Sequence, residues 1–269
     1  MAKALKTNPT DVAKAIAKTK PVYNIPLEGT PMKARDCWSL LEGILPHTRR
    51  ALLYGPPGTG KTHITTYLGL NDSKQVFSIT LDEGTPSAEL RGFFHPKGHE
   101  FVWMDGPAIM AWRTGGDLIL NEINNASQEV LTLLYVLLDD PATARITLPT
   151  GETVAPHPDF RAFATMNGLP EDLPPALQDR FAVHIHVNKT NPEAIKALIP
   201  YRFRAIVRKT CDLTDARRVT LREWLAFFKA LESGVHADIV GLSILGEQRW
   251  GGLRETLLLA AAETPSTDI

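Results

Sequence analysis

Residues 51–62 read ALLYGPPGTGKT, a short apolar run that leads into a loop rich in glycine and proline. From Gly55 to Thr62 the loop fits the pattern G-x-x-x-x-G-K-[ST], and a helix is predicted from His63 to Leu70. Glycines let main-chain N–H groups turn inward around phosphate oxygens, and the N-terminal end of the following helix adds partial positive charge. The stretch therefore predicts a phosphate-binding loop between a strand and a helix.

The predicted ligand of this loop is a nucleoside triphosphate. Lys61 is expected to bind its β- and γ-phosphates, and the Thr62 hydroxyl to bind Mg²⁺. Adenine is favoured over guanine because the stretch 188–191, NKTN, lacks the aspartate of the guanine-reading pattern N-K-x-D. The predicted cofactors are thus ATP and Mg²⁺. The predicted nucleotide-binding residues are Gly55, Pro56, Pro57, Gly58, Thr59, Gly60, Lys61, Thr62 and His63.

Short apolar runs alternate with stretches of helix length through the middle of the chain. This alternation predicts an α/β fold, a mostly parallel sheet sandwiched by helices. Ligands of such sheets bind beyond the carboxyl ends of the strands. The predicted strands are Ala51–Tyr54, Gln75–Leu81, Asp117–Leu120, Phe160–Met166 and Phe181–Val187.

The strand pattern ends near residue 188, and the remaining sequence predicts helices. Asn191 followed by Pro192 is a typical helix start, with a cap and then proline at the first position. Thr220 and Glu223 have the spacing of a capping box, and a last helix is predicted over Leu253–Ala262. The expected regions are a helical and loop lead-in at 1–48, an α/β nucleotide-binding core at 49–189 and a small helical lid domain at 190–269.

Hydrolysis of a bound triphosphate requires a group that orients or deprotonates water. The predicted strand that begins at Asp117 ends in Asn121 and Glu122. Glu122 is expected to activate the water, and Asn121 to lie near the metal ion, where an aspartate is usual. Because hard cations favour charged oxygen ligands, the neutral Asn121 predicts weaker Mg²⁺ binding and slower turnover.

Three further polar residues are candidates for catalysis. Asn167 follows a predicted strand and is expected to position water or contact the γ-phosphate, although Asn-Gly is also a common turn. Arg180 is expected to reach the γ-phosphate of a neighbouring subunit; the alternative is an ion pair with Asp172 or Asp179. Arg222, in a predicted first turn of a helix, is expected to fold back onto the nucleotide, unless it is only a solvated arginine.

The order of these motifs resembles that of the AAA+ ATPases, and within them the MoxR-like branch of the helix-2-insert type. The motifs lie between residues 49 and 231 and read GPPGTGKT, WMDGPAIMAWRTGGDLILNEIN, FRAFATMNG, PPALQDRF and TLREW. The resemblance implies Lys61 and Thr62 as Walker A residues, Glu122 as the Walker B base, Asn167 as sensor 1, Arg180 as arginine finger and Arg222 as sensor 2. Asn121 departs from the Walker B pattern, which puts metal affinity and rate in question but not nucleotide binding.

The resemblance also implies two inserted β-hairpins. One spans Phe93 to Asp105 within the second helix of the core. The other spans Arg145 to Val154, where residues alternate around a Thr-Gly turn. In such proteins these hairpins project toward a pore or a partner. The aromatic residues that either contact a partner or pack on the core are Phe93, Phe94, Phe101 and Trp103.

An arginine finger that acts in trans requires a head-to-tail interface, which closes into a ring. The resemblance suggests a hexamer that remodels or activates a client protein, possibly one with a von Willebrand-type A domain. One alternative is a nucleic-acid-translocating NTPase of the restriction type, which the near-neutral charge disfavours. Another is an ATP-gated scaffold that hydrolyses little because of Asn121.

The bulk composition sets limits on location and partners. The chain has 269 residues, a formal net charge of −1 and a pI near 6.7. Its overall charge therefore predicts no general attraction to nucleic acid or to an anionic membrane. Two cysteines without metal-type spacing predict reduced thiols and a cytoplasmic protein. No apolar run approaches the ~20 residues that span a bilayer, and residues 1–20 lack the apolar core of a signal peptide. A short helix is predicted at Val12–Lys18.

Overall fold

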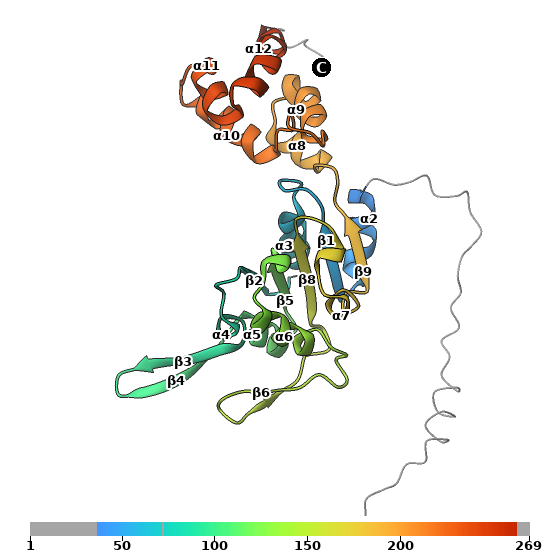
Figure 1. Ribbon diagram of the computed structural model, residues 1–269, viewed down its shortest axis with the longest axis vertical. Helices are drawn as coiled ribbons and strands as arrows, with labels where there is room; N and C mark the ends of the chain where they lie inside the picture. The colour runs from blue at the N-terminus through green and yellow to red at the C-terminus, as the bar shows by residue number, and fades with distance from the viewer. Residues whose placement is uncertain (1–36, 72, 263–269) are drawn as a thin grey trace, which may run out of the picture. The chain divides into compact units, whose positions relative to one another are not determined.

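The computed structural model describes residues 37–71 and 73–262 (Figure 1). The predicted helix Val12–Lys18 lies outside these residues. The first described elements are the helix α2, Cys37–Ile44, and the 3₁₀ turn η1, Leu45–His47. No helix within the described ranges is long and apolar enough to cross a membrane.

A parallel five-stranded sheet in the order β2-β5-β8-β1-β9 forms the centre of the fold. The prediction of a parallel α/β sheet is confirmed, and each strand ends within two residues of its predicted bounds. The strands are β1 Arg50–Tyr54, β2 Val76–Thr80, β5 Asp117–Asn121, β8 Arg161–Met166 and β9 Val183–His186.

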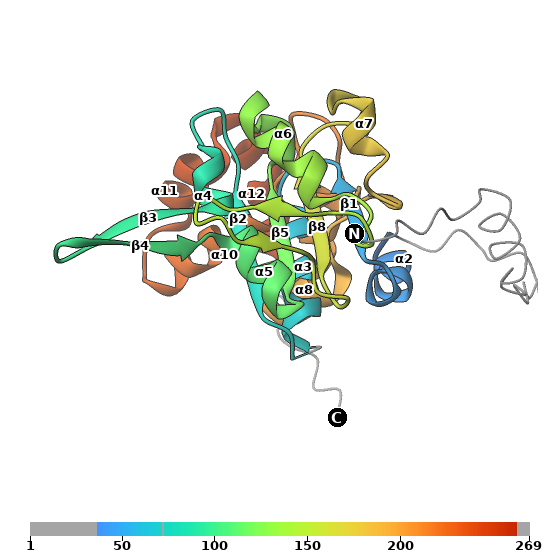
Figure 2. The same cartoon turned by 90° about the horizontal axis from the view of Figure 1, so that it is seen from below.

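Successive residues of the central strands face two separate apolar clusters, which explains their uninterrupted apolar sequence. In β1, Leu52 belongs to one cluster, whereas Ala51 and Leu53 belong to the other. Helices α4 to α7 contribute to the first cluster, and α2, η1 and α3 to the second, so helices cover both faces (Figure 2). The covering helices are α3 Lys61–Asn71, α4 Ser87–Arg91, α5 Pro107–Thr114, α6 Gln128–Leu137 and α7 Pro175–Gln178, with 3₁₀ turns η2 Ile123–Asn125 and η3 Pro170–Asp172.

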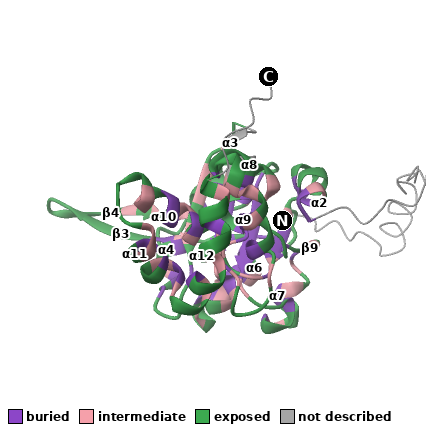
Figure 3. Cartoon of the chain, turned by 90° about the horizontal axis from the view of Figure 1, so that it is seen from above, coloured by how far each residue is buried: buried purple, intermediate pink, exposed green. Residues whose placement is uncertain are grey.

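Two antiparallel hairpins extend from the core at the predicted positions (Figures 1 and 2). One pairs β3, Gly92–Lys97, with β4, Glu100–Asp105, between helices α4 and α5. The other pairs β6, Ile146–Thr147, with β7, Thr153–Val154. Figure 3 shows the β3–β4 ribbon as mostly exposed. Its exposed large apolar side chains are Phe93, Phe94, Phe101, Val102 and Met104.

Arg113 of α5 ties the base of the β3–β4 hairpin to the turn of the β6–β7 hairpin. Its Nε donates to Asp105 Oδ2 at 2.7 Å, and its Nη1 and Nη2 donate to the two carboxylate oxygens of Glu152 at 2.6 and 2.7 Å. These hydrogen bonds lower the pKa of the exposed Glu152 carboxyl. Asp105 also accepts from Trp103 Nε1 at 2.6 Å. The hairpins are therefore linked to each other and to α5 by one guanidinium group.

The C-terminal part is helical and has its own apolar cluster, which includes Trp224, Phe227, Phe228 and Trp250. The predicted caps are present: the Asn191 side chain accepts from two main-chain N–H groups of α8, and Thr220 and Glu223 form a capping box. The elements are α8 Pro192–Leu198, η4 Tyr201–Phe203, α9 Arg204–Cys211, α10 Leu221–Glu232, α11 Ala237–Val240, the π-helical turn η5 Gly241–Leu245 and α12 Glu247–Ala262.

The last helix begins at Glu247 and not at the predicted Leu253. Gly251 and Gly252 disfavour helix in isolation, which is why the prediction starts after them. Trp250, however, is buried in the C-terminal cluster and packs where a Cβ on Gly241 would clash with its ring. Tertiary packing of this indole thus extends the helix through both glycines.

A buried ion pair joins the amino-terminal ends of two central strands. Arg161 of β8 donates through Nε and Nη2 to the two oxygens of Asp117 of β5, at 2.8 and 2.6 Å. Asp117 is fully buried and Arg161 is 7% exposed. A bidentate pair of this kind fixes the relative position of the two strands.

We expect Asp117→Ala to lower the free energy of unfolding by about 3–5 kcal/mol, because it leaves the Arg161 charge buried without its carboxylate. Urea denaturation followed by circular dichroism measures the change. Arg217→Ala, which breaks the exposed ion pair with Asp215, is the matched control and should unfold like the wild type. Equal midpoints for the two variants would contradict a structural role for the buried pair.

Candidate nucleotide-binding site

The predicted phosphate loop runs from the end of β1 into the first turn of α3, and three of its glycines have positive φ. The φ angles are 128° at Gly55, 73° at Gly58 and 100° at Gly60, a region that other residues rarely adopt. Space is also restricted: a Cβ on Gly55 would lie 2.8 Å from the Val187 carbonyl oxygen, and one on Gly58 2.8 Å from Thr220 Cβ. The glycines are therefore required both by backbone conformation and by close neighbours.

Lys61 lies inside this loop with its side chain turned back onto it. The residue is 6% exposed, and its Nζ donates to the carbonyl oxygens of Gly55 and Pro56 at 2.8 and 2.9 Å and to Asn167 Oδ1 at 3.0 Å. Burial lowers the pKa of the ammonium group to about 8; the charge of Glu122 opposes this shift and that of Arg218 adds to it. The three donors of the ammonium group thus bind neutral oxygens, and none of the described carboxylates pairs with it directly.

Asn167 connects Lys61 to Glu122. Its amide Nδ2 donates to both carboxylate oxygens of Glu122, at 2.9 and 2.8 Å, while its Oδ1 accepts from Lys61. Glu122 adopts a left-handed conformation, φ 55° and ψ 44°, between β5 and η2. Such a conformation is uncommon for a residue with a side chain and occurs often at functional sites. The structure brings the predicted base, sensor and lysine into one hydrogen-bonded chain.

Asn121 lies beside the other predicted metal-binding residue, Thr62. Its Oδ1 accepts from Thr62 Oγ1 at 2.9 Å and from Thr165 Oγ1 at 3.2 Å, and its Nδ2 donates to Ser78 Oγ at 3.0 Å. The amide oxygen therefore faces Thr62 and the amide nitrogen faces β2. Two oxygen ligands suit a hard cation, so the pair fits Mg²⁺, although with one negative charge fewer than an aspartate would give.

The remaining loop residues have simpler surroundings. Thr59 is buried, and its hydroxyl donates to the Pro56 carbonyl at 3.1 Å. His63 is exposed in the first turn of α3. Trp38 of α2 packs on Gly60, 3.2 Å from where a Cβ would lie, and donates from Nε1 to the Lys189 carbonyl at 2.9 Å. Helix α2 thus packs against the phosphate loop. The sequence does not predict this contact.

Arg180 does not join this cluster. Within the described part of the chain its ion pair is with Asp139, at 3.4 Å between Nη2 and Oδ1, and not with the predicted Asp172 or Asp179. Arg50 also contacts Asp139: its Nη1 donates to the main-chain carbonyl oxygen of Asp139 at 3.2 Å. The Nε of Arg180 is buried without a hydrogen-bond partner among the described residues.

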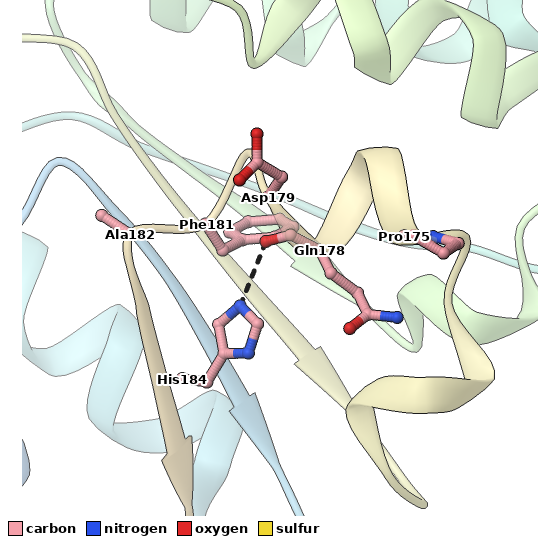
Figure 4. Close-up of a pocket in the computed structure, with 6 residues that line it drawn as sticks. All are labelled: Pro175, Gln178, Asp179, Phe181, Ala182 and His184. Atoms are coloured by element: carbon pink, nitrogen blue, oxygen red, sulfur yellow. Dashed lines mark hydrogen bonds between the residues drawn. The ribbon is translucent and has the colours of Figure 1, made fainter.

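A separate pocket of about 510 Å³ lies between α7 and β9 (Figure 4). The residues that line it flank Arg180 in the sequence. A His184 ring nitrogen lies 3.1 Å from the Gln178 carbonyl oxygen across it. The residues that line it are Pro175, Gln178, Asp179, Phe181, Ala182 and His184. None of them belongs to the phosphate loop.

Two arginines lie near the start of α10. Arg222, the predicted one, is exposed, and the described residues give it no hydrogen bond or ion pair. The positive charge of Arg218, which the sequence did not single out, helps to lower the pKa of Lys61. The sequence carried no signal for Arg218, nor for Ser78 and Thr165 around Asn121, because each becomes relevant only through tertiary contacts.

A glycine loop between a parallel strand and a helix, with Lys61 inside it and Glu122 at the end of a neighbouring strand, defines a P-loop nucleotide-binding protein. The model of the AAA domain (dynein-related subfamily) matches residues 50–181. This match supports the prediction, made from the motifs, of an AAA+ ATPase of the MoxR-like branch.

Relatives with curated names share this part of the chain. Midasin of Dictyostelium discoideum is 32% identical over 192 residues, which are 68% of this chain and 3% of midasin. Protein NorQ of Paracoccus denitrificans is 32% identical over 137 residues, 48% of this chain and 49% of NorQ. A solved RuvB mutant of Thermotoga maritima is 16% identical, with a TM-score of 0.49, over 81% of this chain and 68% of that one. The chain thus spans about half of NorQ and a small fraction of midasin.

We expect the Lys61 ammonium group to titrate with a pKa of about 8 in the nucleotide-free protein. Since the Glu122 charge raises this pKa, Glu122→Gln should lower it further. Phosphate binds the charged form, so ATP affinity should fall as the pH rises through about 8, by up to about tenfold per pH unit. NMR of isotope-labelled lysine and calorimetry at several pH values measure these effects. A midpoint near 10.5, the ordinary lysine value, would contradict the buried position of Lys61.

Proposed function

We propose that the chain binds ATP with Mg²⁺ and hydrolyses it, and that it works in a ring that remodels or activates a partner protein. The observation that carries the proposal is the hydrogen-bonded chain from Lys61 through Asn167 to Glu122, beside Thr62 and Asn121. A binding lysine, a polar sensor and a carboxylate base lie together where the γ-phosphate of a bound nucleotide is expected.

The same contacts suggest how binding leads to chemistry. A triphosphate in the loop offers Lys61 charged acceptors in place of the carbonyl oxygens of Gly55 and Pro56. Once Lys61 turns to the β- and γ-phosphates, Asn167 loses a donor and is free to bind the γ-phosphate or water. Glu122 is then released to accept a proton from that water.

In the proposed reaction the water oxygen forms a bond to the γ-phosphorus in line with the leaving group. The bond between that phosphorus and the β–γ bridging oxygen breaks, which gives ADP and inorganic phosphate. Thr62 would hold Mg²⁺ directly and Asn121 would hold it through its amide oxygen or a bound water. When bound, the ion neutralises charge on the β- and γ-phosphate oxygens.

Glu122→Gln is expected to reduce phosphate release by about 10²-fold or more, the usual contribution of a general base, while ATP still binds. Asn121→Asp should lower the Mg²⁺ concentration that gives half-maximal rate, because it restores a charged ligand. Glu232→Gln, at an exposed carboxylate of α10, is the matched control and should behave like the wild type. A malachite-green assay against Mg²⁺ concentration measures all four proteins.

The neutral side chain of Asn121 also supports a second candidate, an ATP-gated scaffold with little hydrolysis. In that case the wild type would release phosphate as slowly as Glu122→Gln, whereas Asn121→Asp would be fast. Wild-type turnover well above that of Glu122→Gln would instead favour the ATPase. Translocation of nucleic acid is not favoured, because the formal net charge is −1.

The proposed ring explains why Arg180 lies apart from Lys61 of its own chain. An arginine with a buried, unpartnered Nε and a single ion pair to Asp139 is available to a second subunit. In a head-to-tail ring, Arg180 would reach the γ-phosphate held by its neighbour and stabilise transition-state charge. Six subunits and a client with a von Willebrand-type A domain are what the family resemblance suggests.

Mixing two inactive variants tests the action of Arg180 in trans. Arg180→Ala keeps Lys61 and Glu122 but lacks the arginine, whereas Glu122→Gln keeps the arginine but lacks the base. We expect each variant to be nearly inactive alone and a mixture to recover activity, since some interfaces then combine an intact site with an intact Arg180. No recovery in mixtures that demonstrably co-assemble would show that Arg180 acts within its own chain or not at all.

A further inference from the structure

The side-chain amide of Asn121 lies among hydroxyl groups from three neighbouring elements. Its Oδ1 accepts from Thr62 of α3 and from Thr165 of β8, and its Nδ2 donates to Ser78 Oγ of β2 at 3.0 Å. The sheet places two of these partners on opposite sides of the amide, because β5 lies between β2 and β8. Asn121 is 7% exposed and Thr165 is 1% exposed, so the amide is largely shielded from water.

An asparagine amide has two ends of opposite character, and its direction decides what it offers to a cation. A hydroxyl group can donate or accept a hydrogen bond, so Thr62 and Thr165 are also able to accept from Nδ2 if the amide turns over. In that reversed orientation N–H groups would face Thr62. Amide N–H groups cannot ligate a cation, whereas the carbonyl oxygen can. Asn121 therefore suits a metal ion only in the orientation that the structure shows.

Ser78 supplies the acceptor that favours this orientation. With Oδ1 toward Thr62, the Nδ2 group of Asn121 faces β2, where the Ser78 hydroxyl accepts from it. Without that acceptor, an N–H group of a mostly buried amide would lose its hydrogen bond, which is unfavourable. Ser78 itself is exposed on β2, a strand at the edge of the sheet, so its hydroxyl contributes little to packing of the core.

We propose that Ser78 is a positioning residue for the metal ion. It accepts from Nδ2 of Asn121 and so keeps Oδ1 directed toward Thr62, the side on which Mg²⁺ is expected. This inference rests on the proposed function, since it takes the ligand to be a nucleotide with Mg²⁺. An aspartate at position 121 would have an oxygen at either end of its carboxylate and would need no such acceptor. Ser78 thus allows an asparagine to serve where an aspartate is usual.

Ser78→Val and Ser78→Thr test the assignment, because the two side chains have nearly the same shape and only threonine has a hydroxyl. Calorimetry with a non-hydrolysable ATP analogue, with and without Mg²⁺, gives the ratio of affinities that the metal ion contributes. Ser78→Val should lower this ratio about fivefold or more, the usual effect of an unsatisfied hydrogen-bonding group. Ser78→Thr should keep the wild-type ratio.

The same pair of variants in the Asn121→Asp background separates positioning from a general structural effect. A carboxylate has no N–H group that requires an acceptor. We therefore expect Ser78→Val and Ser78→Thr to give equal ratios when combined with Asn121→Asp. Equal ratios for the two variants with Asn121 in place, or the same loss in the Asn121→Asp background, would overturn the proposal.

A further readout needs no nucleotide. In NMR spectra of the empty wild type, nuclear Overhauser effects should connect the Nδ2 protons of Asn121 to Ser78. They should connect to Thr62 or Thr165 in Ser78→Val and remain with residue 78 in Ser78→Thr. Unchanged contacts in Ser78→Val would overturn the proposal. Absence of ATP binding by the wild type would instead overturn the proposed function, and these contacts would still test what orients Asn121.

Discussion

The site depends on a buried lysine whose charge is satisfied by neutral oxygens. Lys61 donates to two loop carbonyls and to the Asn167 amide, and no carboxylate in the part of the chain that the structure describes pairs with it directly. Burial of a charge is costly unless other dipoles replace water, and the lowered pKa of about 8 reflects that cost. These contacts hold the Lys61 ammonium group in place through neutral oxygens. An anionic oxygen would be a stronger acceptor for the same N–H groups. Only a loop with glycines at positive φ can fold its carbonyl oxygens around the ammonium group in this way.

The order of the strands supplies the other groups. Since β8 lies between β1 and β5, the residues that follow these three strands are neighbours at one edge of the sheet: the phosphate loop, Asn167, and Asn121 with Glu122. At the opposite end of β5 and β8, the ion pair of Asp117 and Arg161 fixes their relative position. The hydrogen bonds from Lys61 through Asn167 to Glu122 thus lie between strands whose relative position this ion pair fixes.

Local pattern was enough to predict the sheet, the loop and the caps of α8 and α10, because each depends on residues close together in sequence. The two hairpins were predicted from the family resemblance. Contacts between distant residues were not predictable from one sequence. Arg180 pairs with Asp139 and not with the nearby acids, and Thr220, far along the chain, packs on Gly58 of the phosphate loop. The start of α12 was wrong for the same reason, since the burial of Trp250 outweighs the low helix propensity of two glycines.

Calorimetric titration of the protein with ATP and Mg²⁺ tests the central claim most directly, with Lys61→Ala as the comparison. The wild type should bind one ATP per chain, and Lys61→Ala should lose that binding while it remains folded, because the loop then has no cation for the β- and γ-phosphates. No heat of binding with the wild type, or equal affinity in Lys61→Ala, would contradict the role given to Lys61 and to the groups that depend on it.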